Sequence, residues 1–294
     1  MKILITGATG FIGRRVVSML APQHEVSALA RNPAQSITEG RVSTIMLDLA
    51  RPLDHRVLPS QVDVIIHLAQ ANVAFPESAE EMFAVNTRST LQLLDYGRRA
   101  GAGRFILASS GDVYGFRIGA SKETDAPAPQ SFYAITKLSS ELLVNAYSSY
   151  IEPCVLRFFH PYGPGQSNRL IARLAQRIRN GESVRLHNND RPHVSPVYID
   201  DAVTAVDRAI NSSYSGVVNI AGNTSISMRD LATKIGSVIE CEPVFEETGE
   251  EAGDLVGCDE LMKQVLGTWP MVGLTDGLSR MLKGKEDTGC QAHV

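Results

Sequence analysis

The sequence predicts an α/β fold in which a Rossmann-type, doubly wound parallel sheet is joined to a smaller C-terminal lobe. Two observations support this prediction. Over about the first 160 residues, short apolar runs alternate with longer segments whose apolar residues recur at helical spacing. A glycine-rich turn directly follows the first apolar run. Strands that are apolar throughout are typical of parallel sheets covered by helices on both faces, and such sheets bind ligands at the carboxyl ends of their strands.

The expected elements follow one another in a regular series. Apolar and β-branched runs predict strands at 2–6 (KILIT), 25–30 (EVSALA), 42–47 (VSTIML), 62–69 (VDVIIHLA), 104–109 (RFILAS), 153–159 (PCVLRFF) and 217–221 (VVNIA). Helical spacing of apolar residues predicts helices at 77–100, 132–149, 169–180 and 226–240. Long crossovers between the early strands indicate parallel pairing, because parallel strands cannot be joined by a tight turn.

The series also predicts how the chain divides. Residues 1–159 together with about 194–222 are expected to form the Rossmann domain, and about 160–193 with 223–285 the substrate-binding lobe. The second part begins at a turn-rich segment, HPYGPGQSN, where the alternation stops. The polar tail 286–294 lacks periodicity and is predicted to be disordered.

Composition excludes several classes of function. The formal charge of the 294-residue chain is −4 and its Lys and Arg residues form no stripe, which argues against a nucleic-acid partner. The N-terminus lacks the pattern of a secretory signal, and no apolar stretch approaches the roughly 18 residues of a membrane span. The four cysteines form no CxxC pair and fit reduced thiols better than a disulfide frame or a metal site. We therefore expect a cytoplasmic protein with no membrane partner and no metal.

The glycine-rich turn predicts a dinucleotide site. It reads TGATGFIG, follows the first strand and opens a helix. Glycines at every third position allow a tight turn, a close approach of the backbone to a pyrophosphate and close packing of helix on strand. The free N–H groups and the positive dipole end of the helix then face the phosphates. The expected cofactor contacts here are Gly7, Thr9, Gly10, Phe11, Ile12 and Gly13.

The end of the second strand bears on the choice of cofactor. An NAD-selective site usually places Asp or Glu there to accept a hydrogen bond from the ribose 2′-hydroxyl, but this chain has Ala30 followed by Arg31. An Arg can bind a 2′-phosphate through charge-assisted hydrogen bonds, so NADP(H) is favoured over NAD(H). Arg31 could equally be a solvated surface cation. Asp48 and Leu49, which end the third strand, are placed at the adenine edge, although Asp48 could simply start a turn.

A Tyr–Lys pair predicts the catalytic centre. Tyr133 and Lys137 are four residues apart in a helical pattern, so they share one helix face. A nearby ammonium is expected to lower the pKa of the phenol, and Tyr133 could then exchange a proton with a substrate hydroxyl during hydride transfer. Ser110 follows the fifth strand and could hold the substrate oxygen beside Tyr133. Each motif alone is common, and their combination carries the prediction.

Together these motifs give the chain a family resemblance over about residues 1–285. The segments TGATGFIG, HLA, FAVN, SSGDVYG, YAITK, RFFHPYGPGQ, PVYIDDAV, VVNIAG and LGTWP occur in this order. The sequence resembles the extended short-chain dehydrogenase/reductase family, in its NAD-dependent epimerase/dehydratase group, whose members include nucleotide-sugar epimerases.

The resemblance implies a role for each matching residue. Tyr133 would be the acid/base, Ser110 its hydroxyl partner, and Lys137 would bind the nicotinamide ribose and tune Tyr133. Tyr133 and Lys137 therefore also count among the cofactor contacts, as do Leu68 and Ala69 of HLA and Asn86 of FAVN, the last of which would support the active-site network. The resemblance also implies a homodimer formed through helices 77–100 and 132–149.

Three positions depart from the family pattern. Dehydratases of the family have an acidic pair after the Ser or Thr, whereas Gly111 and Asp112 follow Ser110 here, so dehydration is not expected. His160 stands where the family usually has Asn. His193, with Arg191 and Arg185 nearby, stands where an Arg usually clamps the substrate diphosphate. The substrate-binding candidates are Ser110, Asp112, His160, Arg191 and His193.

The sequence leaves several functions open. The expected activity is that of a nucleoside-diphosphate-sugar epimerase or 4-ketoreductase, with Tyr133 as acid/base. Arg31 favours reduction, while the general family pattern favours epimerisation. Arg191 could replace the missing clamp by a local shift, or the substrate carries no diphosphate, and His160 and His193 could equally be ordinary polar loop residues. The alternative functions are an NADPH-dependent reductase of a carbonyl substrate without a nucleotide and a non-catalytic nucleotide-sensing module.

Overall fold

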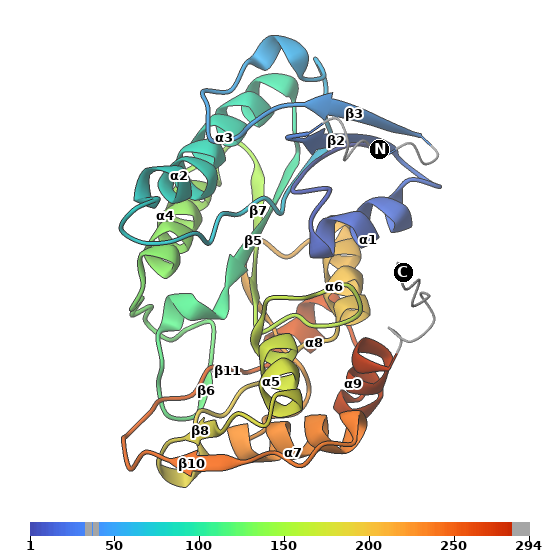
Figure 1. The fold of residues 1–294 in the computed structure, drawn as a ribbon. Helices are drawn as coiled ribbons and strands as arrows, with labels where there is room; N and C mark the ends of the chain where they lie inside the picture. The colour runs from blue at the N-terminus through green and yellow to red at the C-terminus, as the bar shows by residue number, and fades with distance from the viewer. Residues whose placement is uncertain (33–36, 38–40, 284–294) are drawn as a thin grey trace.

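The fold is built around a parallel sheet, as predicted. The computed structural model of the chain describes residues 1–32, 37 and 41–283 (Figure 1). Seven strands pair in parallel in the order β3-β2-β1-β4-β5-β7-β9. Their bounds are β1 Lys2–Thr6, β2 Glu25–Ala30, β3 Val42–Met46, β4 Val64–His67, β5 Arg104–Ser110, β7 Glu152–Phe158 and β9 Gly216–Ile220.

The sheet reverses its winding between β1 and β4. β1 pairs with β2 on one side and with β4 on the other, so the chain leaves these neighbouring strands toward opposite ends of the sheet. The carboxyl ends of β1 and β4 lie side by side, because Thr6 is in register with His67. This edge is where a doubly wound sheet binds its ligand.

Helices cover both faces of the sheet (Figure 1). α1 (Phe11–Leu20) and α6 (Ile199–Asn211) lie on one face, and α2 (Ala79–Phe83), α3 (Ser89–Ala100) and α4 (Phe132–Ala146) lie on the other. A π-helical turn, Ala84–Arg88, interrupts the helix that the sequence predicts over 77–100. Periodicity cannot reveal such a turn, because the apolar spacing continues through it; π-helical turns are frequent at functional sites.

The remaining elements form a smaller part below the carboxyl edge of the sheet (Figure 1). It contains α5 (Leu170–Arg179), α7 (Met228–Ile239), α8 (Glu260–Leu266), α9 (Leu274–Leu282) and two short parallel ladders, in which β8 (Val184–Leu186) pairs with β10 (Phe245–Glu247) and β6 (Ala120–Ser121) with β11 (Val256–Gly257). One apolar core runs from α1 and α6 into α5, α7 and α9, so the two parts are packed together. The sequence-based division into domains stays a prediction, and the tail 286–294 lies outside the described residues.

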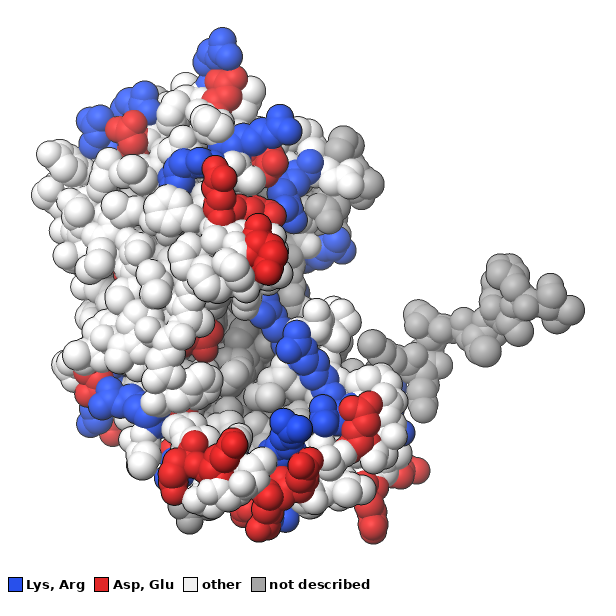
Figure 2. Space-filling model, turned by 60° about the vertical axis from the view of Figure 1, so that its left-hand side comes forward, with Lys and Arg blue, Asp and Glu red and all other residues white. Residues whose placement is uncertain are grey.

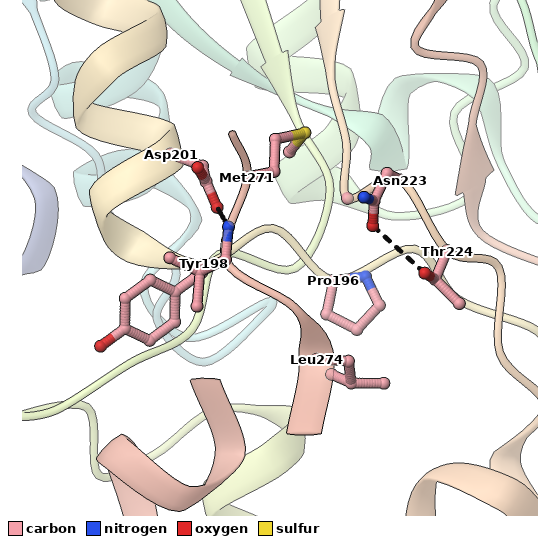
Figure 3. Close-up of a pocket in the computed structure, with 9 residues that line it drawn as sticks. Pro196, Tyr198, Asp201, Asn223, Thr224, Met271 and Leu274 are labelled. Atoms are coloured by element: carbon pink, nitrogen blue, oxygen red, sulfur yellow. Dashed lines mark hydrogen bonds between the residues drawn. The ribbon is translucent and has the colours of Figure 1, made fainter. Parts of the chain in front are cut away.

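One carboxylate fastens the C-terminal segment to α6. Asp201 accepts a 2.9 Å hydrogen bond from the Trp269 indole and a 3.1 Å bond from the Val272 backbone N–H. Burial raises the pKa of Asp201, and these two bonds oppose that shift. Figure 3 shows a small cavity beside the carboxylate, lined by residues that include Pro196, Tyr198 and Leu274. Its volume of about 10 Å³ admits no more than a water molecule, so it is not the substrate site.

Candidate active site

The glycine turn is shaped by backbone contacts that exclude side chains. Gly7 has φ +66°, and a Cβ there would lie 2.5 Å from the backbone nitrogen of Ala69. A Cβ on Gly13 would overlap the Gly7 carbonyl oxygen, so the start of α1 packs directly on the turn. No side chain caps the N-terminus of α1 at Gly10, which leaves its N–H groups open. This cradle fits a dinucleotide pyrophosphate, and it brings Gly7 against the predicted contacts Leu68 and Ala69.

Hydrogen bonds between polar side chains join the carboxyl ends of β1 and β4 next to this cradle. Thr6 Oγ1 lies 2.6 Å from His67 Nδ1 and accepts a 3.2 Å bond from the Ala69 N–H. His67 Nε2 lies 3.1 Å from Thr90 Oγ1 of α3. Burial, together with the charge of Lys137, lowers the pKa of His67 to about 3. The imidazole is therefore neutral, and it joins β1, β4 and α3 by hydrogen bonds.

The residues predicted at the adenosine end lie at the carboxyl ends of β2 and β3. The Arg31 side chain is 68% exposed, and its guanidinium lies 4.0 Å from Glu81 of α2. Asp48 accepts a 3.0 Å bond from the Ala50 N–H and lies 3.9 Å from Arg51. Asp48 thus starts a turn, while Leu49 is buried. Because Glu81 offsets the charge of Arg31, the local field favours a 2′-phosphate less than the sequence suggested.

The predicted catalytic pair lies on α4, whose first turn is capped by Ser131 Oγ accepting from the Ala134 N–H at 3.1 Å. Lys137 is 1% exposed, and burial lowers its pKa to about 8, while Glu141 acts in the opposite direction. Burial and the charge of Asp112 raise the pKa of Tyr133. The expectation of a lowered pKa for this phenol is therefore wrong for the protein without ligands, because desolvation and the charge of Asp112 outweigh the charge of Arg169 and the hydrogen bond from Ser110.

The Tyr133 hydroxyl is already engaged with a polar partner. It donates a 2.6 Å hydrogen bond to Oε1 of Gln70, an exposed residue three positions after His67. A hydrogen bond from Ser110 favours the phenolate of Tyr133, as does the positive charge of Arg169. Ser110, Tyr133 and Gln70 thus converge at the carboxyl edge, where the sequence places the reacting oxygen.

Asn86 positions the site from within the protein. It is 1% exposed in the π-helical turn; its Oδ1 accepts from the Ala71 N–H at 2.8 Å, and its Nδ2 donates to the Ala71 carbonyl and the Thr136 hydroxyl, both at 2.9 Å. These bonds tie the loop after β4 to α4. Asn86 thus holds the loop after β4 against α4, and its expected role as a cofactor contact stays a prediction.

A buried ion pair supports α4 from the other side. Arg157 of β7 donates to Glu141 at 3.0 and 2.6 Å, and its guanidinium lies 4.5 Å from the centre of the Tyr114 ring. Ser109 also donates to Glu141. Both ionic side chains are at most 5% exposed. This network fixes the end of β5, and hence Ser110, relative to the helix that carries Tyr133 and Lys137.

The substrate-side candidates separate into two groups. Asp112 and His160 lie with Ser110 and Tyr133: the Asp112 N–H donates to Ser110 Oγ at 3.2 Å, and the charge of Asp112 acts on both Tyr133 and His160. His160 has φ +41°, in the left-handed region. A bulky residue rarely adopts this conformation, which occurs most often in functional sites.

Arg191 and His193 are instead tied to Asp254. Arg191 donates to one Asp254 oxygen, and the His193 N–H donates to the other at 2.8 Å, with His193 Nδ1 3.2 Å from that oxygen. Asp254 is 4% exposed. Arg185, the other cation considered for this role, is 3.8 Å from Glu246. Asp254 thus offsets the charge of Arg191 and holds His193 by hydrogen bonds, which weakens both residues as a diphosphate clamp.

Three residues of the site were missed by sequence reasoning. Gln70 stands just after a strand end, where polar side chains collect, so its position was a usable signal. Arg169 begins the helix that the sequence places at 169–180, and helix patterns do not say which way a first residue points. Asp254 comes from a segment with no local motif, and only the fold brings it to His193.

The surface shown in Figure 2 has few patches of a single charge. Figure 2 shows acidic and basic side chains interspersed, with a hollow between the two parts of the molecule and Lys and Arg side chains along it. Within the described residues, no group of His, Cys, Asp and Glu is arranged to hold a metal ion. None of the helices in this part of the chain is long and apolar enough to cross a membrane.

Comparison with known proteins places the chain. The sequence profile of the NAD dependent epimerase/dehydratase family matches residues 3–221. The chain belongs to this family. Relatives include the probable UDP-glucuronate 4-epimerase of Rhizobium meliloti (strain 1021), 25% identical over 100% of this chain and 99% of the relative. The resemblance seen in the sequence is confirmed, and the fold and site belong to a family of NAD-dependent enzymes that act on nucleotide sugars.

Solved structures of family members share the whole architecture. MoeE5 in complex with UDP-glucuronic acid and NAD is 27% identical, with a TM-score of 0.83 over 96% of this chain and 98% of that chain. UDP-glucuronic acid 4-epimerase from Bacillus cereus in complex with NAD is 26% identical, with a TM-score of 0.84 over 96% of this chain and 97% of that chain. The chain therefore spans the full length of these enzymes.

The same structures correct the prediction of the cofactor. Both hold NAD, so the preference for NADP(H) drawn from Arg31 is wrong. The physical reason lies in the surroundings of Arg31, whose side chain is exposed and faces Glu81. An Arg beside a strand end indicates a 2′-phosphate site only when its charge is free to meet the phosphate.

Proposed function

We propose that this protein is an NAD-dependent epimerase of a nucleoside-diphosphate sugar, which inverts a sugar carbinol with Tyr133 as acid/base. The observation that carries the proposal is the convergence of Ser110, Tyr133 and buried Lys137 beside the glycine cradle. Bound NAD would supply the hydride chemistry of this inversion, removal from the sugar carbon and return to it. The cradle of Gly7, Gly10 and Gly13 would hold its pyrophosphate, and Lys137 its nicotinamide ribose.

The residues of the chain handle the proton. Tyr133 is a neutral phenol in the free protein, since its pKa is raised, and its 2.6 Å bond to Gln70 shows that an oxygen acceptor fits at its hydroxyl. A sugar oxygen in that place would exchange its proton with Tyr133, while the Ser110 hydroxyl holds it by a second hydrogen bond. Lys137 favours the phenolate while it is charged, below a pH of about 8.

The nature of the substrate follows from the relatives. Relatives and solved structures carry UDP-glucuronate, UDP-glucuronic acid and UDP-glucose in their names, which supports a UDP-sugar and reaction at C4. Gly111 in place of an acid after Ser110 supports epimerisation over dehydration, since elimination of water needs an acid for the departing hydroxyl.

The proposal is tested with Tyr133→Phe. Purified protein is incubated with UDP-glucuronate or UDP-glucose, and the isomers are separated and quantified by NMR. We expect interconversion with no added cofactor, NAD released on denaturation, and a loss of turnover of at least ~100-fold in the variant, because the acid/base is gone. Binding of NAD should remain. Undiminished turnover in Tyr133→Phe would reject Tyr133 as the acid/base.

One observation favours a second function. Arg191 and His193 are occupied by Asp254, so the lobe offers a weaker diphosphate clamp, which suits a reductase of a carbonyl substrate without a nucleotide. The two functions differ in their response to free UDP. Tight binding of UDP to the NAD-loaded protein, measured by calorimetry, supports the epimerase. No binding of UDP, combined with NADH oxidation by small ketones, supports the reductase.

A further inference from the structure

Two side chains of the substrate side are brought together by a glycine contact. A Cβ on Gly111 would lie 2.5 Å from the Phe159 ring, so the turn after β5 packs directly on the segment after β7. The next residue on each segment is ionisable: Asp112 on one and His160 on the other. β5 and β7 are paired up to Ser110 and Phe158, which fixes the register of the two segments. Asp112 and His160 are therefore held as neighbours by the sheet itself.

The surroundings of this pair set its charge state. Burial lowers the pKa of His160, the charge of Asp112 raises it, and the charge of Arg169 lowers it again. His160 is thus a neutral imidazole with a carboxylate beside it, the arrangement of a general base with its orienting group. Arg169 is exposed at the start of α5. Its backbone carbonyl accepts a 2.9 Å hydrogen bond from the Arg173 N–H, and among the described residues no hydrogen bond or ion pair engages its guanidinium. Its free cation can stabilise negative charge that develops on a bound substrate.

Asp112 and His160 lie next to Tyr133 and Ser110, the residues proposed to handle the first proton. The charge of Asp112 raises the pKa of Tyr133 and that of His160, and the Asp112 N–H donates a hydrogen bond to Ser110. A sugar that presents its reacting oxygen to Tyr133 and Ser110 thus presents neighbouring carbons to Asp112 and His160. His160 is held there at φ +41°, in the left-handed region that few residues other than glycine adopt.

Resting on the proposed function, we infer that Asp112 and His160 form a second proton-transfer pair, which removes a proton from a carbon adjacent to the sugar ketone. Transfer at the carbinol needs only one acid/base, and Tyr133 supplies it. Once that carbon is a ketone, the C–H bonds next to it become acidic. His160, with Asp112 beside it, could then remove a proton from a carbon next to that ketone.

The step balances without any redox partner. The C–H bond breaks and its proton moves to the neutral nitrogen of His160, whose cation is stabilised by Asp112. The electron pair of that bond forms the carbon–carbon double bond of an enolate, and the carbonyl electrons move to oxygen, where Tyr133 and Ser110 donate hydrogen bonds. Return of the proton from His160 restores the ketone. When the proton on the His160 cation exchanges with water before it returns, the carbon receives a proton from the solvent. Delivery to the same face keeps the configuration of that carbon, and delivery to the opposite face inverts it.

The test uses a probe that already carries the ketone, UDP-4-keto-6-deoxyglucose, incubated with the protein in D₂O. NMR of the recovered probe reports deuterium at the carbons that flank the ketone. We expect exchange well above the buffer rate, and a fall of at least ~100-fold in His160→Asn and in Asp112→Asn. Asn suits position 160, because it tolerates the left-handed region. His24→Asn, in the turn between α1 and β2 at the opposite edge of the sheet, is the matched control and should exchange like the parent.

Isomerisation of UDP-glucuronate is measured in parallel to separate the two proposals. A protein that isomerises the sugar but leaves the probe without deuterium overturns the inference alone. Exchange that persists in both variants also overturns it, since some other base would be responsible. A protein that neither isomerises UDP-glucuronate nor exchanges the probe overturns the proposed function and this inference with it.

Discussion

Burial sets the charge of individual side chains in this site. Desolvation is the largest influence on the pKa of Tyr133, Lys137, His67 and His160, and in each case it favours the neutral form. Neutral groups can give or take a proton at little cost, whereas a buried charge needs a partner such as the one Glu141 provides to Arg157. The site therefore separates groups that move protons from a fixed ion pair that holds them in place.

The pKa of His67 predicts how stability depends on acid. It falls from 6.5 in the unfolded chain to about 3 in the fold. The unfolded chain binds the proton first, so stability should decline as the pH falls from about 6 to about 4, by up to ~1.4 kcal/mol per pH unit. His67→Gln should flatten this part of the profile, measured by urea unfolding at several pH values.

His24→Gln is the control for this measurement, since it removes a histidine far from the site and should leave the wild-type slope. A His67→Gln profile as steep as that of the parent would show that other groups are responsible for acid sensitivity.

The sequence could identify candidate catalytic residues, whose roles stay predictions, but not the residues that surround them. Ser110, Tyr133 and Lys137 stand in short motifs whose spacing reflects local geometry. Gln70 and Asp254 owe their roles to contacts across the fold, at 2.6 Å to Tyr133 and 2.8 Å to His193. The sign of the Tyr133 shift was missed for the same reason, since burial is a property of the folded chain.

Among the elements, α4 is the one that carries the proposed acid/base. Its N-terminus is capped by Ser131, and its middle is joined through Thr136 to Asn86 of the π-helical turn. The helix presents Tyr133 in its first turn, directly after the cap. A loosened cap therefore moves the acid/base before it affects anything else.

We expect Ser131→Ala to lower the free energy of unfolding by about 1 kcal/mol and to reduce kcat as well. Ser227 caps α7 in the same way, with its Oγ accepting from the Asp230 N–H at 3.1 Å. Ser227→Ala should cost similar stability without the loss of kcat. Urea unfolding and steady-state kinetics on both variants make the comparison, and an equal effect on kcat would argue against this role of the α4 cap.

For the molecule as a whole, the helices on one face of the sheet carry exposed apolar side chains. Phe83 and Leu91, from α2 and α3, are 47% and 41% exposed, and Ile135 and Leu142 of α4 are 47% and 64% exposed. The latter two are seven residues apart and so share a helix face. Exposed apolar residues on adjoining helices are typical of an interface, in keeping with the expected homodimer.

If this face joins two copies, Leu142→Asp should convert a dimer into a monomer, because it places a charge in an apolar contact. Light scattering after size exclusion measures the mass directly. Ile118→Asp is the control: Ile118 is 76% exposed, but it lies in the loop before β6. A parent protein that elutes as a monomer, or a Leu142→Asp variant that stays dimeric, would contradict the expected interface.

At this scale the sequence predicted most of the fold. The inner strands β1, β4, β5 and β7 are buried on both faces and are therefore nearly continuous apolar runs, which the sequence alone reveals. The edge strand β3 is only partly buried. The two short ladders, β8 with β10 and β6 with β11, were not expected. Strands of two or three residues carry too little pattern to be distinguished from loops, and their partners are far away along the chain.

The hydrogen bond between Trp269 and Asp201 makes the intrinsic tryptophan fluorescence sensitive to movement of the C-terminal segment. Trp269 is the only tryptophan of the chain, its indole N–H bonds Asp201, and the Arg208 guanidinium lies 5.0 Å above its ring. Any movement that frees the C-terminal segment from α6 would expose this indole to water and change its environment. A shift in the intrinsic fluorescence on adding a ligand would thus show directly whether binding tightens or loosens the junction between the two parts of the molecule.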